Sequence, residues 1–262
     1  MATIATHNGS SFSQKHNRRD RSVTDKEAHI DKNGEYEVWL DTSLKDFYKK
    51  QFGNAQEEYN AKQTRNDRKI DDYYKYIEND KKKHVAYEMI VGVYDKNLDD
   101  KSKREILREF ANTWSKRNPH LPMVGCYYHN DEEGEPHIHI DYVPVATNFE
   151  RGMKVQNSLT RALKQQGIES GASIHETPQI LWEKRENGYL EELCNAKGIT
   201  IEHSDTYRGH ESTSAYKNHK LNEENAKLKA ENEKLKQDFN KLAQEFNKTV
   251  KEFKELKGEL ER

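Results

Sequence analysis

The sequence has few of the features that would place it in an oxidising or membrane environment. Its only two cysteines, Cys126 and Cys194, lie far apart and match neither a zinc nor a redox spacing, so reduced, ordinary thiols are the simplest interpretation. The longest apolar runs, such as residues 89–93, are far too short to span a bilayer, and the N-terminus has no hydrophobic signal region. We therefore expect a cytoplasmic protein without a membrane segment.

An excess of positive charge is also missing. Lysine and arginine number 44 against 46 aspartates and glutamates, so the chain lacks the overall positive field of many nucleic-acid-binding proteins. Any affinity for DNA must then come from local basic patches. With 32% hydrophobic and 34% charged residues, the 262-residue chain is too polar to pack end to end around one core. We expect one enzyme-sized domain and a solvated appendage.

The pattern of apolar residues predicts an α+β fold. Residues 1–32 are polar and lack periodicity, which indicates an extended arm or loop. Runs of β-branched and aromatic residues predict strands, and apolar residues at steps of three and four predict helices. The expected strands are 35–40, 85–94, 123–130 and 136–145, and the expected helices are two between the first two strands, then 100–117, 154–166 and 177–196. This order indicates a largely antiparallel β-sheet with helices on one side.

The C-terminal part follows a different pattern. We divide the chain into a domain of residues 1–203, a polar linker of residues 204–219, and a coiled-coil helix of residues 220–262. In this helix leucines recur at seven-residue spacing, as in a leucine zipper, with Thr249 as the one weak d position. Position d holds Leu221, Leu228, Leu235, Leu242 and Leu256, and position a holds Asn225, Asn232, Phe239, Phe246, Phe253 and Leu260.

The charges beside this seam predict a parallel pair of helices. Every g position is acidic, and Lys229, Lys236 and Lys257 follow three of these acids by five residues, where they would form ion pairs with a partner helix. Asparagine at position a lowers stability but is tolerated when it pairs with its mate in a two-stranded parallel coil. We expect a parallel homodimer, with a lone solvated helix as the alternative.

The residues that can carry chemistry gather at the expected hairpin. Because side chains alternate across a strand, His137 and His139 share one face. If the hairpin closes over its acidic turn, His129 lies opposite or diagonal to this pair, within reach of a common ion. Three neutral imidazoles bind divalent metals and leave positions open for water or a phosphate oxygen. Asp131 and Glu132 are near enough to serve as a further ligand or a proton acceptor. The alternative is a hairpin whose histidines merely face solvent.

At these residues the sequence resembles a known group of enzymes. The His-hydrophobe-His of residues 137–139 matches the HUH endonucleases, and the His-Asn-Asp-Glu of residues 129–132, followed by Pro136, resembles the Mob/Pre (MobV) relaxases of mobilizable plasmids. The arm is similar too, because residues 15–19, Lys-His-Asn-Arg-Arg, resemble the family's Lys-His-Asn-Glu-Arg. A second N-terminal element is found in residues 29–37. The resemblance covers roughly residues 1–200.

The resemblance implies an HUH endonuclease-like fold for residues 1–203 and a specific reaction. It makes His16 the nucleophile that attacks a DNA phosphate and leaves a covalent histidine–5′-phosphate bond, while Glu132 acts near the metal as acid or base. The implied metal is Mn²⁺ or Mg²⁺. The implied substrate is DNA at a plasmid origin of transfer, single-stranded or supercoiled, which is nicked on one strand and rejoined. A bacterial protein encoded by a plasmid or mobile element is implied, with a conjugation coupling protein as a further partner.

Basic residues around His16 suit contact with DNA. We expect Lys15, Arg18, Arg19 and Arg21 to hold the phosphodiester through their charge, which gives salt-dependent affinity without base specificity.

The hairpin departs from the family pattern at two points. One additional residue lies between Glu132 and Pro136, and Glu135 stands where a threonine usually precedes the proline. Which of Asp131 and Glu132 reaches the metal therefore stays open.

Two other functions remain alternatives to the relaxase. Replication initiators and transposase-type nucleases of similar fold usually attack with a tyrosine on a helix after the histidine pair, and Tyr189 is the available residue, although a core aromatic is the simpler interpretation. The second alternative is a non-catalytic, metal-containing dimer that binds DNA. Replacement of His16 and Tyr189 separates the two nucleases, and metal binding without strand cleavage favours the binding protein.

Overall fold

The computed structural model describes residues 2–10, 12–24, 30–95, 97–132, 134–202 and 213–260. The chain divides into two compact units, Met1–His203 and Ser204–Arg262, and each is described by itself. Within the described residues, no helix is both long enough and apolar enough to cross a membrane.

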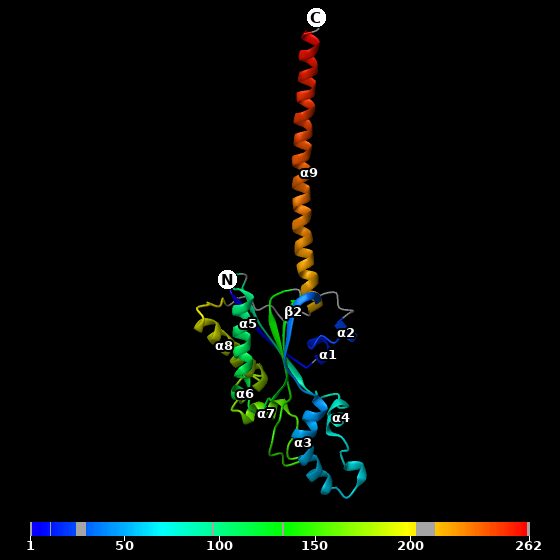
Figure 1. The fold of residues 1–262 in the computed structure, drawn as a ribbon, viewed down its shortest axis with the longest axis vertical. Helices are drawn as coiled ribbons and strands as arrows, with labels where there is room; N and C mark the ends of the chain where they lie inside the picture. Colours follow the sequence, from blue (N-terminus) through cyan, green and yellow to red (C-terminus); the bar gives the residue numbers. More distant parts are fainter. Residues whose placement is uncertain are drawn as a thin grey trace. The chain divides into compact units, whose positions relative to one another are not determined.

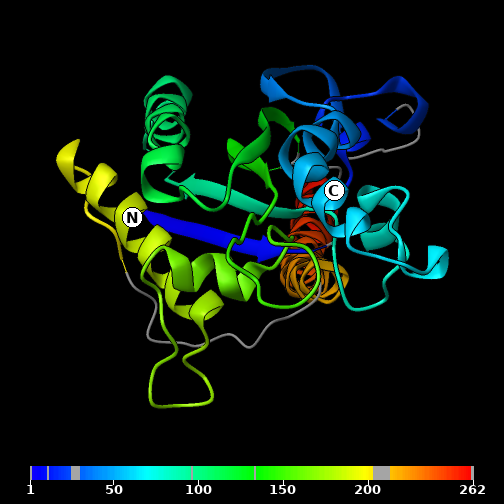
Figure 2. The same ribbon diagram turned by 90° about the horizontal axis from the view of Figure 1, so that it is seen from below.

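Among the described residues, the first unit is built on a five-stranded antiparallel sheet (Figures 1 and 2). The strands follow the order β1-β3-β5-β4-β2, and each pairs antiparallel with its neighbours. β4 and β5 form the predicted hairpin, and the predicted α+β class is confirmed. The bounds are β1 (Thr3–Gly9), β2 (Ile30–Asp41), β3 (Tyr87–Tyr94), β4 (Met123–Glu132) and β5 (His137–Tyr142).

The longer helices begin where the sequence supplies a capping side chain. Ser43, Asp72, Asp99 and Thr177 each accept a hydrogen bond from the backbone N–H three residues later, and Pro178 fits the first turn of its helix. The helices are α3 (Leu44–Ala61), α4 (Tyr73–Glu78), α5 (Asp100–Asn112), α6 (Trp114–Arg117), α7 (Leu159–Gln165) and α8 (Pro178–Ala196), with a short 3₁₀ turn at Asn66–Arg68.

The sheet has one apolar and one polar face. Helices α5 to α8 cover the apolar face, where Ile138 and Ile140 of β5 are completely buried in one cluster with Phe110, Trp114 and Trp182 (Figure 1). Complete burial of side chains of this size contributes about 1.5–3 kcal/mol each, so this face provides most of the cohesion of the unit. Helices α3 and α4 form a second, smaller core with residues that flank the strands.

The expectation that residues 1–32 form an extended arm or loop is wrong. Residues Thr3–Gly9 form β1, an edge strand paired with β3, and two short helices follow, α1 (Gln14–Asn17) and α2 (Arg21–Thr24). An edge strand that contains a single large aliphatic residue, Ile4, has too weak an alternation to be recognised. A helix of four residues is shorter than one hydrophobic period, although Ser13 caps α1 by accepting a hydrogen bond from the His16 N–H.

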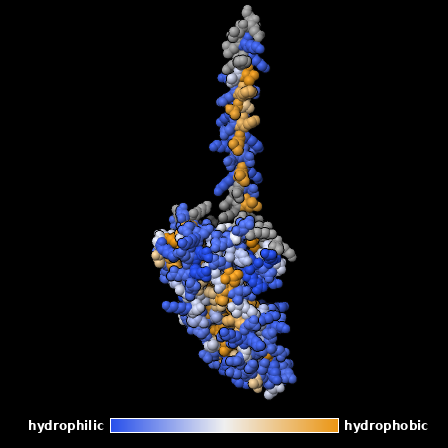
Figure 3. All heavy atoms as spheres, viewed as in Figure 1, coloured by the Kyte–Doolittle hydropathy of each residue, from blue (hydrophilic) through white to orange (hydrophobic). Residues whose placement is uncertain are grey.

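The second unit is described as one helix, α9 (Thr213–Leu260). Of the expected linker 204–219, residues 204–212 lie outside the described ones and residues 213–219 already belong to α9. Its apolar residues form a continuous exposed stripe (Figure 3), in which Phe239 is 70% exposed. The other described members of the stripe are Leu221, Leu228, Leu235, Leu242 and Phe246. The side chains of the remaining predicted zipper positions, Glu224, Glu252, Phe253, Leu256, Glu259 and Leu260, lie outside the described ones.

Candidate metal centre and nucleophile

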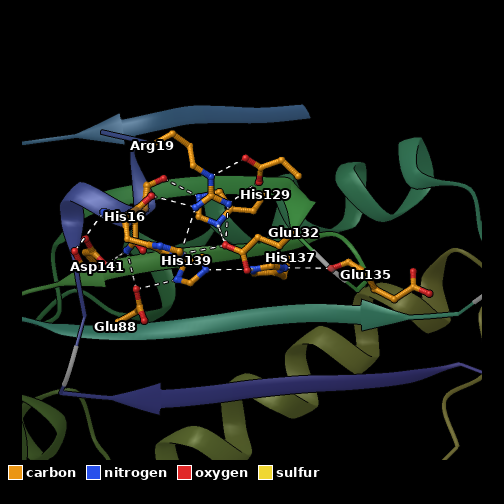
Figure 4. A network of polar contacts seen from close by, with 12 residues as sticks. His16, Arg19, Glu88, His129, Glu132, Glu135, His137, His139 and Asp141 are labelled. Carbon is orange, nitrogen blue, oxygen red and sulfur yellow. Dashed lines mark hydrogen bonds and ion pairs between the residues drawn. The ribbon is translucent and has the colours of Figure 1, made fainter. Parts of the chain in front are cut away.

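Three histidines meet on the polar face of the β4–β5 hairpin (Figure 4). His129 lies directly opposite His137 in the register of the hairpin, and His139 follows two residues later on the same face. The Nε2 atoms of His137 and His139 are 3.1 Å apart. With Glu132, the three side chains offer ligand atoms that all lie within 4.8 Å of one another. The structure therefore brings the three sequence-predicted ligands together.

Hydrogen bonds set which ring nitrogen of the β5 histidines faces this centre. His137 Nδ1 donates to the backbone oxygen of Glu135 at 3.1 Å, and His139 Nδ1 donates to Glu88 Oε1 at 2.8 Å. A neutral imidazole has one N–H, so each bond leaves a lone pair on Nε2. A metal-binding histidine usually has such a hydrogen-bond acceptor on the ring nitrogen that does not bind the metal.

His129 faces the cluster with its other ring nitrogen, Nδ1. Its Nε2 donates to the backbone oxygen of Asn17 at 2.7 Å, while its buried Nδ1 has no hydrogen-bond partner among the described residues. Glu132 Oε1 lies 3.5 Å from that Nδ1, so a lone pair faces a carboxylate oxygen. This contact is repulsive unless a cation lies between the two atoms. Metal–nitrogen bonds of about 2.1 Å would separate neighbouring ligands by roughly 3 Å, so the donor set fits a divalent metal.

Burial disfavours the charged form of His129 and His137, and the neutral imidazole is the form that binds a metal. Burial lowers the pKa of His129, and burial together with the nearby His139 lowers the pKa of His137 to about 4. Burial alone would raise the pKa of Glu132, but the surrounding histidines and Arg19 hold it well below its usual value. Glu132 is therefore an ionised carboxylate.

The sequence-predicted nucleophile lies against the same centre. Helix α1 places His16 Nε2 3.1 Å from Glu132 Oε1, and the His16 ring centroid is 6.1 Å from that of His129 and 6.4 Å from that of His139. Figure 4 shows His16, Glu132 and the three histidines converging on one volume. A phosphate held at the metal-binding atoms would therefore lie beside the His16 ring.

Asn17 connects helix α1, which carries His16, to the histidine cluster. Its buried side chain donates to Glu88 Oε1 at 2.7 Å and to Asp141 Oδ1 at 3.3 Å, while its backbone oxygen accepts the His129 bond. Burial and the neighbouring Glu88 raise the pKa of Asp141 well above its usual value. Helix α1 cannot shift without disturbing the hydrogen-bond partners of two metal ligands.

Sequence reasoning missed Asn17, Glu88 and Asp141 as members of the site. A signal existed for Glu88, because it is the one charged residue in the apolar strand β3, and Asp141 pairs directly with it across β3 and β5. Asn17 precedes both acids by more than seventy positions. No local pattern could therefore show that its side chain hydrogen-bonds to both of them.

Arg19 and Asp131 form a buried ion pair. Arg19 adopts φ 58°, and its guanidinium donates to both carboxylate oxygens of Asp131, at 2.6 and 2.5 Å, and to Glu132 at 2.8 Å. Asp131 is thus outside the cluster of metal-binding atoms, and Glu132 is the acid that joins it. Arg19 is only 8% exposed, so it positions α1 rather than forming an open phosphate contact. The sequence shows both charges but not their pairing.

The other predicted phosphate ligands remain accessible. Lys15, Arg18 and Arg21 are exposed on α1, directly after it and on α2. Arg18 lies 3.6 Å from Asp41, a distance and exposure at which an ion pair contributes little and can open for a phosphate. These three residues supply a local basic patch next to His16.

Tyr189 belongs to the core on the other side of the sheet. Its hydroxyl lies 3.1 Å from the Thr113 hydroxyl, and the Arg117 guanidinium stacks over its ring at 3.9 Å. It packs against Phe110 in the cluster under α5 and α8. This position favours the core interpretation of Tyr189 over that of a nucleophile.

Comparisons with known proteins agree with this picture. No curated protein matches the chain. Among solved structures, the chain is similar to the manganese-bound MobM relaxase domain (MOBV; Mob_Pre) with 22-nucleotide pMV158 oriT DNA, at 16% identity over 82% of this chain and 98% of that one, with a TM-score of 0.46. The complex with a 3′-thiophosphate DNA gives 17% identity, the same coverage and a TM-score of 0.45. The model of the plasmid recombination enzyme family, Mob_Pre, matches residues 7–218. The chain therefore belongs to the plasmid recombination enzyme family.

Proposed function

We propose that this protein is a relaxase that nicks one strand of DNA at a plasmid origin of transfer, holds the 5′ end covalently and rejoins it by reversal. The observation that carries the proposal is the placement of His16 Nε2 3.1 Å from the half-buried carboxylate of Glu132, directly beside a three-histidine cluster. Such an enzyme acts in the bacterial cytoplasm during plasmid mobilization, and a conjugation coupling protein stays a prediction of the family resemblance.

His129, His137 and His139 would hold the metal. Nitrogen donors suit a transition metal better than Mg²⁺, which prefers oxygen ligands, and with the family resemblance this favours Mn²⁺. When bound, the ion withdraws charge from the oxygens of the scissile phosphate and so makes the phosphorus more electrophilic. The polar face of the hairpin, covered by α1, keeps His16 beside that phosphate.

The covalent step uses His16 and Glu132. With His16 as an imidazolium, Glu132 Oε1 accepts the proton from Nε2, which leaves a neutral ring with its remaining proton on Nδ1 and a lone pair on Nε2. Nε2 attacks phosphorus, so an N–P bond forms while the P–O3′ bond breaks. The departing 3′ oxygen takes a proton from Glu132 and leaves as a hydroxyl group. Rejoining is the reverse, with Glu132 as base toward the 3′ hydroxyl.

Replacing Glu132 by glutamine should separate proton transfer from metal binding. The three histidines remain, so we expect Mn²⁺ still to bind, with a dissociation constant raised by about 10–100-fold, the usual effect of losing a residue that supports a metal site. Nicking should fall by about 10²–10⁴-fold, the usual contribution of general acid–base catalysis. Both are measured on full-length protein, by calorimetry and by conversion of supercoiled plasmid to open circles. Loss of metal binding in this variant would instead make Glu132 a metal ligand.

The stripe on α9 supports a parallel homodimer. Six large apolar side chains exposed on one helix face at zipper spacing are unusual unless a partner helix covers them. The charges select the direction of pairing. In a parallel pair Glu231 faces Lys236 of the other copy, whereas an antiparallel pair places the acidic g positions against one another.

A charged residue in the seam should dissociate the dimer. We expect Phe239→Lys to convert the wild-type dimer to a monomer at micromolar concentration, because it places two like charges at one a position. Gln237→Lys, on the same turn but outside the seam, is the matched control and should stay dimeric. Light scattering coupled to size exclusion gives both masses. A monomeric wild type, or a dimeric Phe239→Lys, contradicts the zipper.

A further inference from the structure

The loop of the β4–β5 hairpin supports one of the metal ligands through its backbone. His137 Nδ1 donates to the backbone oxygen of Glu135, and this bond leaves His137 Nε2 as the atom that faces the metal centre. Any change in the path of the loop therefore changes the orientation of His137.

The side chain of Glu135 is directed elsewhere. Figure 4 shows its carboxylate pointing away from the histidine cluster, so it does not act as a ligand in this arrangement. Instead, Glu135 Oε2 is in direct contact with Lys103 Nζ on α5. Lys103 is only 3% exposed, and its second acidic neighbour, Asp100, is 3.7 Å away. A lysine buried to this degree needs a charged partner, and Glu135 supplies the closer contact.

The N-terminal part of α5 thus holds both arms of the hairpin. Asp100 accepts a hydrogen bond from Asn130 of β4 at 3.1 Å, and Lys103 holds the loop that leads into β5. Helix α5 is itself fixed by Ile106, Leu107 and Phe110 in the main core.

We propose that Lys103 and Glu135 are positioning residues for the metal centre: their ion pair fixes the backbone of the hairpin loop and thereby sets His137 as a ligand. The inference rests on the proposed function, because it assigns a role only if the histidine cluster binds a metal.

The test is the affinity of the full-length protein for Mn²⁺, measured by calorimetry. We expect Glu135→Gln and Lys103→Met each to weaken binding by about tenfold or more, the usual effect of losing a residue that supports a metal ligand. The double variant should bind Mn²⁺ no more weakly than the single variant with the lower affinity, because both changes break the same ion pair. Arg104→Gln is the matched control: Arg104 is the next residue on α5 and pairs with Glu35 and Glu37 of β2, not with the hairpin loop. Its affinity should match the wild type.

Other results of the Mn²⁺ titrations would contradict the proposal in different ways. Wild-type affinity in both Glu135→Gln and Lys103→Met overturns the positioning role, even if their melting temperatures fall. Weak binding in Glu135→Gln with normal binding in Lys103→Met also overturns it and makes Glu135 a direct ligand. If Glu135→Gln does not fold, Lys103→Met alone decides, because it preserves volume without leaving a buried positive charge. A wild type that binds no Mn²⁺ refutes the metal centre itself.

Discussion

Replacing His16 by alanine is expected to abolish the covalent DNA adduct and to reduce nicking by about 10³-fold or more, as loss of a catalytic nucleophile does. Only His16 has a ring nitrogen both adjacent to the metal-binding atoms and within hydrogen-bond distance of Glu132 without being held as a ligand, among the described residues. The measurement uses supercoiled plasmid carrying the DNA next to the gene, incubated with Mn²⁺ and then treated with detergent and protease.

The His16→Ala variant should leave the metal centre intact. His16 contributes no atom to the ligand cluster, so Mn²⁺ affinity should stay near that of the wild type. Tyr189→Phe is the control for the alternative nucleophile and should nick and form adducts normally, because Tyr189 lies in the core under α5 and α8. Adduct formation by His16→Ala, or its loss in Tyr189→Phe, would reassign the nucleophile.

Removing a metal ligand is expected to have a comparably large effect. His139→Ala should weaken Mn²⁺ binding by about 100-fold or more and abolish nicking, since it deletes a ligand and leaves the buried Glu88 carboxylate without the partner that holds its pKa below the usual value. His175→Ala, a change at an exposed loop histidine, is the matched control. Removal of the metal from the wild-type protein with a chelator should stop nicking, and added Mn²⁺ should restore it.

The metal prediction has a clear contrary result. Nicking that persists after exhaustive chelation, or in His139→Ala at wild-type rate, would mean that the histidine cluster has a structural role only. Metal binding by the wild type without cleavage of supercoiled or single-stranded DNA would favour the non-catalytic, dimeric binding protein.

The histidine cluster could be predicted from sequence because it depends on residues that are close together in the chain. Alternation puts His137 and His139 on one face, and a hairpin closing over a short acidic turn brings His129 opposite them. The apolar periodicity of the longer helices likewise predicts α5 and α8. These features depend on residues that are neighbours along the chain or across one turn.

The nucleophile and its supports could not be derived in this way. His16 and Glu132 are 116 positions apart, and no periodicity places a four-residue helix over a hairpin, so only family resemblance identified His16. The pairing of Arg19 with Asp131 depends on the same long-range packing. From sequence alone, an arginine beside a nucleophile suggests a phosphate contact and an aspartate beside metal ligands suggests another ligand. In the structure Arg19 and Asp131 are buried against each other as an ion pair instead.

The central claim is that His16 of this chain becomes covalently joined to DNA, and peptide mapping of the adduct tests it most directly. Wild-type protein is incubated with Mn²⁺ and its own flanking DNA as a single strand, digested with nuclease and protease, and analysed by mass spectrometry. The account predicts a nucleotide on the peptide that contains His16, through an N–P bond that acid cleaves readily. A nucleotide on a tyrosine, through an acid-stable O–P bond, would contradict it.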